Sequence, residues 1–486
     1  MFGRAVTFAL VGLEPRRVEV EAHLRSGQQP AFSIVGLADR ACQEAKERVR
    51  SGIASAELEF PKARVVVNLA PAGLRKEGSA FDLSIALAIL AASGQVDPAA
   101  LGRHAVVGEL ALDGRLRPVS GVLAVAEGAK RIGLERILCP AESAAEAALA
   151  GVEPIPLRHL AEAVSYLSGG SRPPPFIPPN GRPVRAHAPD LADVRGQERA
   201  RRALEVAAAG RHNLLLAGPP GTGKTMLARR LPGILPVLGR SEALEVTRIH
   251  SVAGVMHRNR TLIETPPFRA PHHSASMAAI VGGGPGPRPG EVSLAHRGVL
   301  LLDEFPEFQR MVLEALRQPL EDGVISIARA FGRADFPARF QLLATMNLCP
   351  CGGRGNPAAE CGCSAQQLAR FHAKLSQALL DRFDLVVTMP RPRANELSSP
   401  PSEGSDDVRR RVVEARVRVD RACLVRTDEA SALLDAAVDR LPLSGRGRER
   451  VVRVAATVAA LSSAERVAAE HVAEALSYRV PKELAT

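Results

Sequence analysis

The stretch LLLAGPPGTGKTMLARR, from Leu214 to Arg230, determines the fold that we expect around it. Its segment from Gly218 to Thr225 fits the pattern G-x-x-x-x-G-K-[ST], with an apolar strand before it and a helix after it. Glycines in such a turn let backbone N–H groups converge on phosphate oxygens, and the start of the helix adds a partial positive charge. We expect a nucleotide to be bound by Gly218, Pro219, Pro220, Gly221, Thr222, Gly223, Lys224 and Thr225.

Two of these residues and two further strand ends predict nucleotide hydrolysis. Lys224 would bridge the outer phosphates, and the hydroxyl of Thr225 would bind Mg²⁺. The segment GVLLLDE places Asp303 and Glu304 at the end of an apolar strand, where one carboxylate can hold Mg²⁺ and the next can polarise the attacking water. The strand RFQLLATMN ends in Asn347, which could orient that water, although a strand-terminal Asn alone is usually a cap. The expected cofactors are ATP and Mg²⁺.

Two Pro- and Gly-rich stretches, residues 169–189 and 391–405, divide the chain because they can form neither a helix nor a central strand. Residues 1–168 mix strand and helix patterns and predict an α+β domain. Residues 190–390 alternate short apolar strands with helical or irregular segments, which predicts an α/β core with a parallel sheet. Residues 406–486 space Val, Ala and Leu three and four apart, which predicts a helical domain.

The net charge of +11 is unevenly placed along the chain. Residues 1–170 carry 19 Lys and Arg against 19 Asp and Glu, whereas residues 171–390 carry 27 against 18. This basic excess suits an anionic polymer, but from charge alone a solvated Arg-rich surface is an equally good interpretation. With 3% aromatic residues and no Trp, any nucleic acid would be bound through its phosphates rather than by base stacking.

The composition also indicates a compartment. No apolar run approaches the roughly 18 residues that a membrane helix needs, and the start MFGRAVTFALVGLEPRR is typical of a strand rather than a signal peptide. Seven cysteines in a long chain without a secretion signal favour free thiols or a metal site over a disulfide framework. We therefore expect a cytoplasmic protein with no membrane partner.

Four cysteines gather in the segment CPCGGRGNPAAECGC. The pair Cys349 and Cys351 is followed, after nine residues, by the pair Cys361 and Cys363. Thiolates paired in tight turns satisfy tetrahedral Zn²⁺, so we predict a structural zinc site. Reduced thiols and a redox pair remain alternatives, because C-x-C spacing is less usual for zinc than C-x₂-C.

The order of phosphate loop, acidic strand end, strand-terminal Asn and the segment LLDRFDL resembles AAA+ ATPases. In particular, it resembles the branch that contains magnesium-chelatase ATPase subunits and minichromosome-maintenance helicases. The resemblance implies that Arg382 reaches the γ-phosphate of a neighbouring subunit, and that Arg446 of LSGRGRER occupies the sensor-2 position of a helical lid. An arginine that acts on the nucleotide of a neighbouring subunit implies a ring, and hexamers are the rule in this family.

About seventy residues separate the phosphate-loop helix from the acidic strand, more than a plain crossover needs. They include TPPFRAPHHSASMAAIVGGG, which resembles the insertion that this AAA+ branch carries in its second helix. Arg269, His272 and His273 could present donors to DNA in a central pore. An ordinary structural loop explains these residues about as well.

A further segment, VISIARAFGRADFPARF, is expected to form two strands joined by a turn at residues 331–333. The family places such a hairpin just before the Asn strand and points it into the pore. Arg329 and Arg333 near its tip are candidates for DNA phosphate contacts, because guanidinium groups bind phosphate in a bidentate manner.

The first part of the chain resembles the proteolytic domain of Lon-type proteases, a fold that is also similar to ribosomal protein S5. The segment RKEGSAFD keeps a serine, Ser79, at the position of the Lon nucleophile. At the position of its lysine base, SGVLAVA has Leu123. A serine without a base is not an activated nucleophile, so we expect a Lon-like fold without peptidase activity.

Taken in order, these segments resemble the magnesium-chelatase-like proteins of the YifB/ComM type. The resemblance implies a homo-hexameric DNA motor or helicase that promotes branch migration of recombination intermediates during natural transformation. DNA and further copies of the chain are its implied partners. Two alternatives stay open: the ATPase motor subunit of a metal chelatase, and an ATP-dependent protease or protein-remodelling factor.

Overall fold

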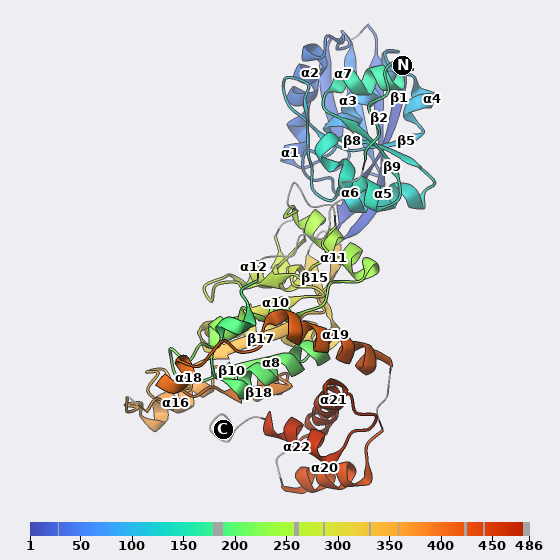
Figure 1. Ribbon diagram of the computed structural model, residues 1–486. Coiled ribbons are helices and arrows are strands. Elements are labelled where there is room, and N and C mark those ends of the chain that lie inside the picture. The colour runs from blue at the N-terminus through green and yellow to red at the C-terminus, as the bar shows by residue number, and fades with distance from the viewer. Residues whose placement is uncertain are drawn as a thin grey trace.

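The structure is a computed structural model, which describes residues 1–27, 29–177, 188–256, 262–284, 287–329, 332–357, 359–421, 425–440 and 443–479. Figure 1 shows the N-terminal strands at the top, a second sheet in the middle and the C-terminal helices at the bottom. Among the described residues, no helix is both long enough and apolar enough to cross a membrane.

The first sheet has seven strands in the order β3-β4-β2-β1-β5-β8-β9. The strands are β1 (Phe2–Val11), β2 (Glu14–Arg25), β3 (Ala31–Val35), β4 (Arg64–Ala70), β5 (His104–Val106), β8 (Arg136–Pro140) and β9 (Glu153–Leu157), and a separate pair is formed by β6 (Glu109–Leu110) and β7 (Leu116–Arg117). Strand β2 is antiparallel to β1 and β4, whereas β5, β8 and β9 continue parallel to β1. The sheet is therefore mixed.

Helices accompany this sheet, and one of them is completely buried. They are α1 (Arg40–Gln43), α2 (Ala45–Ser55), α3 (Asp82–Ala92), α4 (Pro98–Leu101), α5 (Val122–Arg131), α6 (Ala144–Leu149), α7 (Leu160–Leu167) and the 3₁₀ turn η1 (Ala141–Ser143). All residues of α3 are buried, in keeping with a sequence that is apolar on every side. A Cβ atom at Gly3 would lie 2.2 Å from the carbonyl oxygen of Ala88, so this glycine allows α3 to approach β1 closely.

The second sheet is parallel throughout and has the order β11-β14-β17-β10-β18. Its strands are β10 (Leu214–Ala217), β11 (Phe268–Arg269), β14 (Val299–Leu302), β17 (Gln341–Met346) and β18 (Leu385–Thr388). Two antiparallel pairs stand apart from it, namely β12 (Gly282–Gly283) with β13 (Arg288–Pro289) and β15 (Val324–Arg329) with β16 (Gly332–Pro337). The parallel sheet predicted from the short apolar strands is confirmed.

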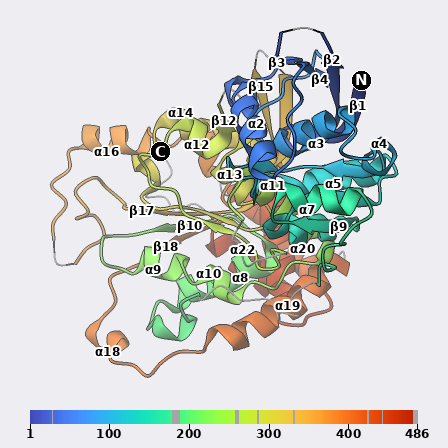
Figure 2. The ribbon, with the colours of Figure 1, turned by 90° about the horizontal axis from the view of Figure 1, so that it is seen from above.

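Short helices connect these strands. They are η2 (Leu191–Asp193), α8 (Glu198–Gly210), α9 (Lys224–Ala228), α10 (Leu231–Ile234), α11 (Arg240–Ala253), α12 (Met277–Val281), α13 (Glu291–Leu294), η3 (Phe305–Glu307), α14 (Arg310–Ala315), α15 (Arg317–Asp322), α16 (Ala365–His372), α17 (Gln377–Leu380) and α18 (Ala394–Leu397). Seen from above, α16 and α18 lie at the rim of the molecule, away from the first sheet (Figure 2).

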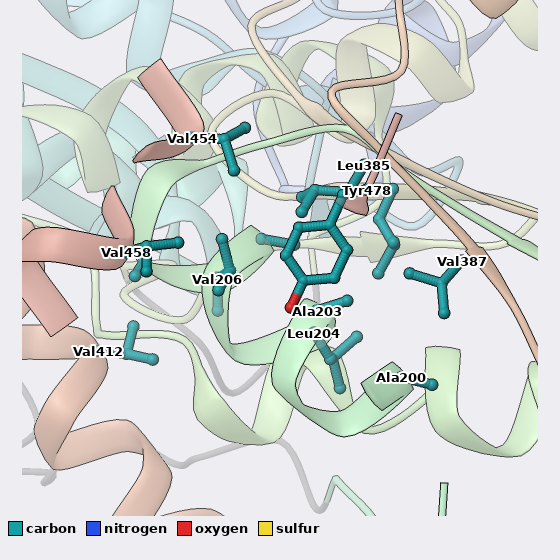
Figure 3. Packing of buried hydrophobic residues seen from close by; sticks show 14 of the residues in the cluster. Ala200, Ala203, Leu204, Val206, Leu385, Val387, Val412, Val454, Val458 and Tyr478 are labelled. Carbon is teal, nitrogen blue, oxygen red and sulfur yellow. The ribbon is translucent and has the colours of Figure 1, made fainter. Parts of the chain in front are cut away.

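The chain ends in four helices that share a core with the second sheet. They are α19 (Ser405–Arg421), α20 (Asp428–Arg440), α21 (Gly445–Leu461) and α22 (Ala469–Ser477). Tyr478, just after α22, is buried among Ala203 and Leu204 of α8 and Leu385 of β18 (Figure 3). Its hydroxyl donates to Glu474 over 3.0 Å, so the one polar atom of this buried side chain is satisfied.

Several contacts among the described residues join the first sheet and its helices to the second. Helix α5 packs against α11, where the N–H of Gly121 donates to the carbonyl oxygen of Ser251 and the Ser251 hydroxyl donates to Glu146. Burial raises the pKa of Glu146. In addition, the β1–β2 turn inserts Leu13 into the core that contains Phe336 of β16. The β15–β16 hairpin is therefore in contact with the N-terminal part of the chain.

Candidate functional site

The carboxyl ends of three neighbouring parallel strands bring together the predicted hydrolysis residues. Gly218 follows β10, Asp303 follows β14 and Asn347 follows β17. Strand β17 lies between the other two, and its register pairs Met346 with Ala217. Ligands of parallel α/β sheets bind outside this end of the strands, so the edge is a candidate binding site on topology alone.

The phosphate loop, residues 218–225, needs its glycines for different reasons. Gly221 and Gly223 have φ of +78° and +86°, a left-handed conformation that side chains rarely adopt. Gly218 is required by packing, because a Cβ atom there would lie 2.3 Å from the carbonyl oxygen of Met389 after β18. The loop thus packs against the edge of the sheet. Because Gly221 and Gly223 have no side chains, the backbone N–H groups at the centre of the loop can bind phosphate oxygens.

Lys224 is held at the centre of this loop. Its Nζ donates to the carbonyl oxygens of Gly218 and Pro219, both over 2.8 Å, and to Oδ1 of Asn347 over 3.1 Å. Burial lowers the pKa of Lys224, and the carboxylates of Asp303 and Glu304 oppose that shift. The predicted lysine and the predicted asparagine therefore meet at one point, 123 residues apart in the chain.

The acidic pair is organised by a threonine that the sequence analysis missed. The hydroxyl of Thr225 donates to Oδ1 of Asp303 over 2.8 Å, and the hydroxyl of Thr345 donates to the same oxygen. The oxygen of Thr345 also accepts the N–H of Glu304 over 3.1 Å. Residues two apart on a strand point to the same side. The position of Thr345 two residues before Asn347 was therefore the sequence signal that its side chain faces the site.

Glu304 stands in an unusual backbone conformation beside a histidine. Its φ of +55° is left-handed, a costly conformation for a residue with a side chain. Its carboxylate lies 3.5 Å from Nδ1 of His273. His273 stacks on His272, with ring centroids 4.1 Å apart, and the His272 ring is bonded to the hydroxyl of Ser274. The histidine pair that we suggested for a pore thus lies next to the acidic strand end.

The arginine of the same insertion that we suggested for the pore forms an ion pair within the chain. Arg269, in edge strand β11, makes two hydrogen bonds of 2.6 Å to the carboxylate of Glu291 at the start of α13. The hydrogen bonds to Glu291 raise the pKa of Arg269. Its guanidinium group therefore links β11 to α13 in this conformation.

Arg382 and Arg446 lie at the opposite end of the sheet from the phosphate loop. The carbonyl oxygen of Arg382 accepts from Asn213, which precedes β10, whereas the phosphate loop follows β10. Four strand residues span about 13 Å. Both guanidinium groups bind the same carboxylate, that of Glu321 in α15; Arg382 is 6% exposed and Arg446 is 68% exposed. Neither arginine is near the phosphate loop of its own chain.

A cavity of about 510 Å³ opens at this far end of the sheet, and its lining has seven arginines and four carboxylates. The arginines that line it are Arg211, Arg297, Arg339, Arg382, Arg416, Arg450 and Arg453. Within the described part of the chain, Nε of Arg382 and Nη1 of Arg450 are buried without a hydrogen-bond partner. Buried donors of this kind are costly, so the cavity is suited to an anionic ligand.

The predicted β15–β16 hairpin is present, but its turn was placed too late. Arg329 pairs with Gly332, so the strand resumes at Gly332 and the connection is residues 330–331, which lie outside the described residues. The side chain of Arg329 also lies outside them. Arg333 is 68% exposed and donates to Ser326 and Asp335 on the same hairpin, over 3.0 and 3.2 Å. The sequence placed the turn at residues 331–333, but Gly332 and Arg333 belong to β16 and pair with Arg329 and Ala328.

The four cysteines converge as predicted. The sulfur of Cys349 lies 3.4 Å from that of Cys351, and the sulfur of Cys361 lies 3.7 Å from each of these two. All four Sγ atoms, including that of Cys363, lie within 4.8 Å of one another. The cluster can therefore hold a metal ion.

Among the described residues, the hydroxyl of the serine of the first part is bonded to a carboxylate and not to a lysine. The hydroxyl of Ser79 donates to the carboxylate of Glu109. Leu123 is buried in α5. Lys76, the lysine closest to Ser79 in sequence, is buried and donates to the carbonyl oxygen of Pro71. Neither Ser79 nor Lys76 is therefore bonded to the other in the described part of the chain.

Sequence comparisons agree with this arrangement. Three family models of the magnesium-chelatase subunit ChlI match residues 20–143, 190–397 and 402–479. The competence protein ComM of Haemophilus influenzae is 42% identical, over 97% of this chain and 96% of its own. The protein YifB of Escherichia coli is 41% identical with the same coverage. The chain belongs to the YifB/ComM type of magnesium-chelatase-like proteins.

A more distant similarity covers about a third of the chain. The DNA replication licensing factor MCM4 of Arabidopsis thaliana is 29% identical over 179 residues, which is 36% of this chain and 17% of that protein. Membership of the magnesium-chelatase-like family agrees with an ATPase built on the site described above.

Proposed function

We propose that this chain is an ATPase that assembles as a ring of six copies and moves DNA, promoting branch migration of recombination intermediates in natural transformation. The observation that carries the proposal is the separation of Arg382 and Arg446 from the phosphate loop of their own chain. A site with Lys224, Asp303 and Glu304 on one chain and these arginines on the next requires a ring or filament of copies.

The residues at the strand ends would share the work of hydrolysis. The amides of the phosphate loop and Nζ of Lys224 would bind the outer phosphates. Thr225 and Asp303, already 2.8 Å apart, would hold Mg²⁺, which neutralises charge on the phosphates. Glu304 would polarise the attacking water, and Asn347 would orient it. Thr345 keeps both acidic residues in place.

The far end of the sheet would complete the site of a neighbouring copy. Arg382 would leave Glu321 and bind the γ-phosphate as negative charge develops there, and Arg446 on α21 would follow it from the lid. The cationic cavity provides the surrounding positive potential. Because both arginines share one carboxylate in the single chain, ring closure would release them together.

Support for DNA as the partner comes from charge and from relatives. The basic excess falls in the part of the chain that carries the ATP site, and Arg333 stands exposed on its hairpin. The relative ComM is named for competence, and MCM4 for DNA replication licensing. Phosphate contacts of this kind would follow the strand without reading its sequence. We place this activity in the cytoplasm.

The alternative is a magnesium-chelatase-type motor subunit, which the family models favour by name. Such a subunit would hydrolyse ATP without stimulation by DNA. A protein-remodelling factor with a Lon-like N-terminal domain is a further alternative; the bond between Ser79 and Glu109 speaks against peptidase activity in it. ATPase activity that rises with single-stranded DNA favours the DNA motor, and degradation of casein favours the protease.

We also assign a structural zinc ion to Cys349, Cys351, Cys361 and Cys363. Four thiolates at these separations match the all-sulfur tetrahedral site that zinc occupies. Elemental analysis of the purified protein should find about one zinc per chain, and its absence would contradict the assignment.

The test of the DNA motor is strand displacement on branched DNA in the presence of ATP. The wild-type protein should displace the strand. Lys224→Ala should not, because this variant lacks the ammonium group that binds the outer phosphates of ATP. Lys62→Ala, which removes an exposed lysine of the N-terminal part, is the matched control and should behave as wild type. Equal displacement by all three proteins would show that ATP does not drive the motion.

A further inference from the structure

The four cysteines belong to a loop that packs on the phosphate loop. We call residues 349–363 the cysteine loop. A Cβ atom at Gly352 would lie 3.0 Å from both Cγ and Cδ of Pro220, and a Cβ atom at Gly355 would lie 3.8 Å from Cδ of Pro219. Gly352 thus lies close to Pro220 with no room for a side chain between them, and Gly355 lies near Pro219.

Both contact points depend on glycine. Gly352 and Gly355 have φ of +74° and +77°, the left-handed conformation that other residues rarely adopt. At Gly352 the space is also taken, since any side chain would displace Pro220. The close fit is therefore a property of the loop backbone, and whatever fixes that backbone also fixes the prolines.

The sulfur atoms fix the backbone on either side of these glycines. Zinc–sulfur bonds of about 2.3 Å in a tetrahedron place sulfur atoms about 3.8 Å apart. The separations of 3.4, 3.7 and 3.7 Å among Cys349, Cys351 and Cys361 are close to that value. The N–H of Gly353 points at the sulfur of Cys351 and the N–H of Arg354 at that of Cys349, over 3.4 and 3.2 Å. Such N–H···S bonds stabilise thiolates, the form that binds a metal.

The remaining side of the phosphate loop is already supported. Gly218 is packed on the backbone after β18, and Asn347 binds Lys224. Only one residue separates Asn347 from Cys349, so the cysteine loop continues directly from the strand that carries the asparagine. The phosphate loop is therefore enclosed between the sheet edge and the cysteine loop.

We propose that zinc in the cysteine loop holds the phosphate loop in its nucleotide-binding shape, so that zinc occupancy sets the affinity for nucleotide. This inference rests on the proposed function in two respects, that residues 218–225 bind a nucleotide and that the four cysteines bind zinc. With zinc bound, Gly352 and Gly355 stay against Pro220 and Pro219. Without zinc, the two cysteine pairs separate, the prolines lose their support, and the amides of the phosphate loop no longer converge.

The experiment measures binding of a fluorescent ADP analogue to the full-length protein, with zinc content determined on the same sample. Three states are compared: protein as purified, protein freed of zinc with a chelator under reducing conditions and exchanged into Mg²⁺ buffer, and protein to which zinc has been returned. We expect affinity to fall at least tenfold on zinc removal and to recover on its return. Circular dichroism confirms that the helices persist throughout.

Two variants distinguish a loss of support for the phosphate loop from a general loss of folding. Gly352→Ala should keep zinc yet bind the analogue several-fold more weakly, because its methyl group displaces Pro220. Gly362→Ala lies in the same loop with no atom within 4 Å of the added Cβ, so it should match the wild type in both measurements.

The outcomes are distinguishable. Unchanged affinity in zinc-free protein, wild-type affinity in Gly352→Ala, or protein that never binds zinc would overturn the inference while leaving the ATP site intact. Failure of the zinc-loaded wild type to bind the analogue would instead overturn the proposed function.

Discussion

At the scale of single residues, the site depends on short polar contacts between strand ends. Lys224, Thr225, Asp303, Glu304 and Asn347 could be chosen from local patterns, because each follows an apolar strand or belongs to the phosphate-loop motif. Their partners Thr345 and His273 are joined to Asp303 and Glu304 by tertiary contacts across many residues of sequence. Thr345 is marked only by its position two residues before Asn347, and no local pattern marks His273.

Thr345 provides the prediction at this scale. Thr345→Val keeps the shape of this buried side chain but removes its bonds to Asp303 and to the N–H of Glu304. Hydrogen bonds to charged groups contribute about 1.5–3 kcal/mol, so we expect kcat for ATP hydrolysis to fall roughly tenfold to 100-fold. Nucleotide affinity should stay near wild type, because the hydrogen bonds given for Thr345 go to Asp303 and Glu304 and not to the phosphate loop.

The matched control is Thr345→Ser, which retains the hydroxyl and should stay within about threefold of wild type in kcat. Steady-state ATPase assays on the wild type and the two variants measure these differences in kcat. Equal rates for the Val and Ser variants would mean that the hydroxyl does not organise the acidic pair.

At the scale of elements, strands and helices were predictable wherever one face or every face is apolar. The strands ending in Asp303 and Asn347 and the apolar helix α3 are examples. The turn of the β15–β16 hairpin was misplaced because Gly332 fits both a turn and a strand, and only cross-strand pairing decides between them. The contact between that hairpin and Leu13 could not be predicted, since it joins residues more than 300 positions apart.

The β15–β16 hairpin carries the prediction for DNA. Arg329→Ala combined with Arg333→Ala should weaken DNA binding and reduce the slope of log K against log salt by about two, because each arginine neutralises about one phosphate. Basal ATPase activity should remain near wild type. Gel-shift assays at several salt concentrations provide the measurement.

As a matched control, Arg25→Ala combined with Arg40→Ala removes two exposed arginines from the N-terminal part, so the net charge changes equally. This control should bind DNA as wild type does. If both double variants lose the same affinity, only overall charge matters and the hairpin has no special role.

The contact between the C-terminal helices and the sheet should respond to pH through His212. Burial lowers the pKa of His212 from its usual 6.5 to about 4, and Nε2 is bonded to Thr457 of α21 over 2.8 Å. The neutral form is favoured in the folded state, so stability is full above pH 6.5. As pH falls from 6.5 towards 4, the unfolded chain takes up the proton first and stability is lost, by about 1.4 kcal/mol per pH unit.

His212→Gln removes that titration and keeps a group that can bond to Thr457. Its urea-unfolding midpoint should therefore fall less between pH 6.5 and 5 than that of the wild type. Circular dichroism is the suitable probe, because the chain has no Trp. Parallel pH profiles for the two proteins would exclude His212 as the cause.

At the scale of the whole molecule, the phosphate loop and Arg382, which we propose as the two halves of a shared ATP site, lie at opposite ends of one sheet. The phosphate loop follows β10, and Arg382 lies beside the residue that precedes β10. This division follows from parallel topology, which places all carboxyl ends together and all amino ends at the other side. A head-to-tail arrangement of copies would bring the two ends into contact, and six such contacts would close a ring.

The most direct measurement mixes two variants that are each inactive. Lys224→Ala loses the phosphate-loop half of the site, and Arg382→Ala loses the arginine half. After random mixing in equal amounts, about one contact in four joins an intact phosphate loop to an intact arginine. The account predicts that DNA-stimulated ATPase activity returns in the mixture, to at most about a quarter of the wild-type rate. A mixture as inactive as its two components, or full activity of Arg382→Ala alone, would contradict a site shared between copies.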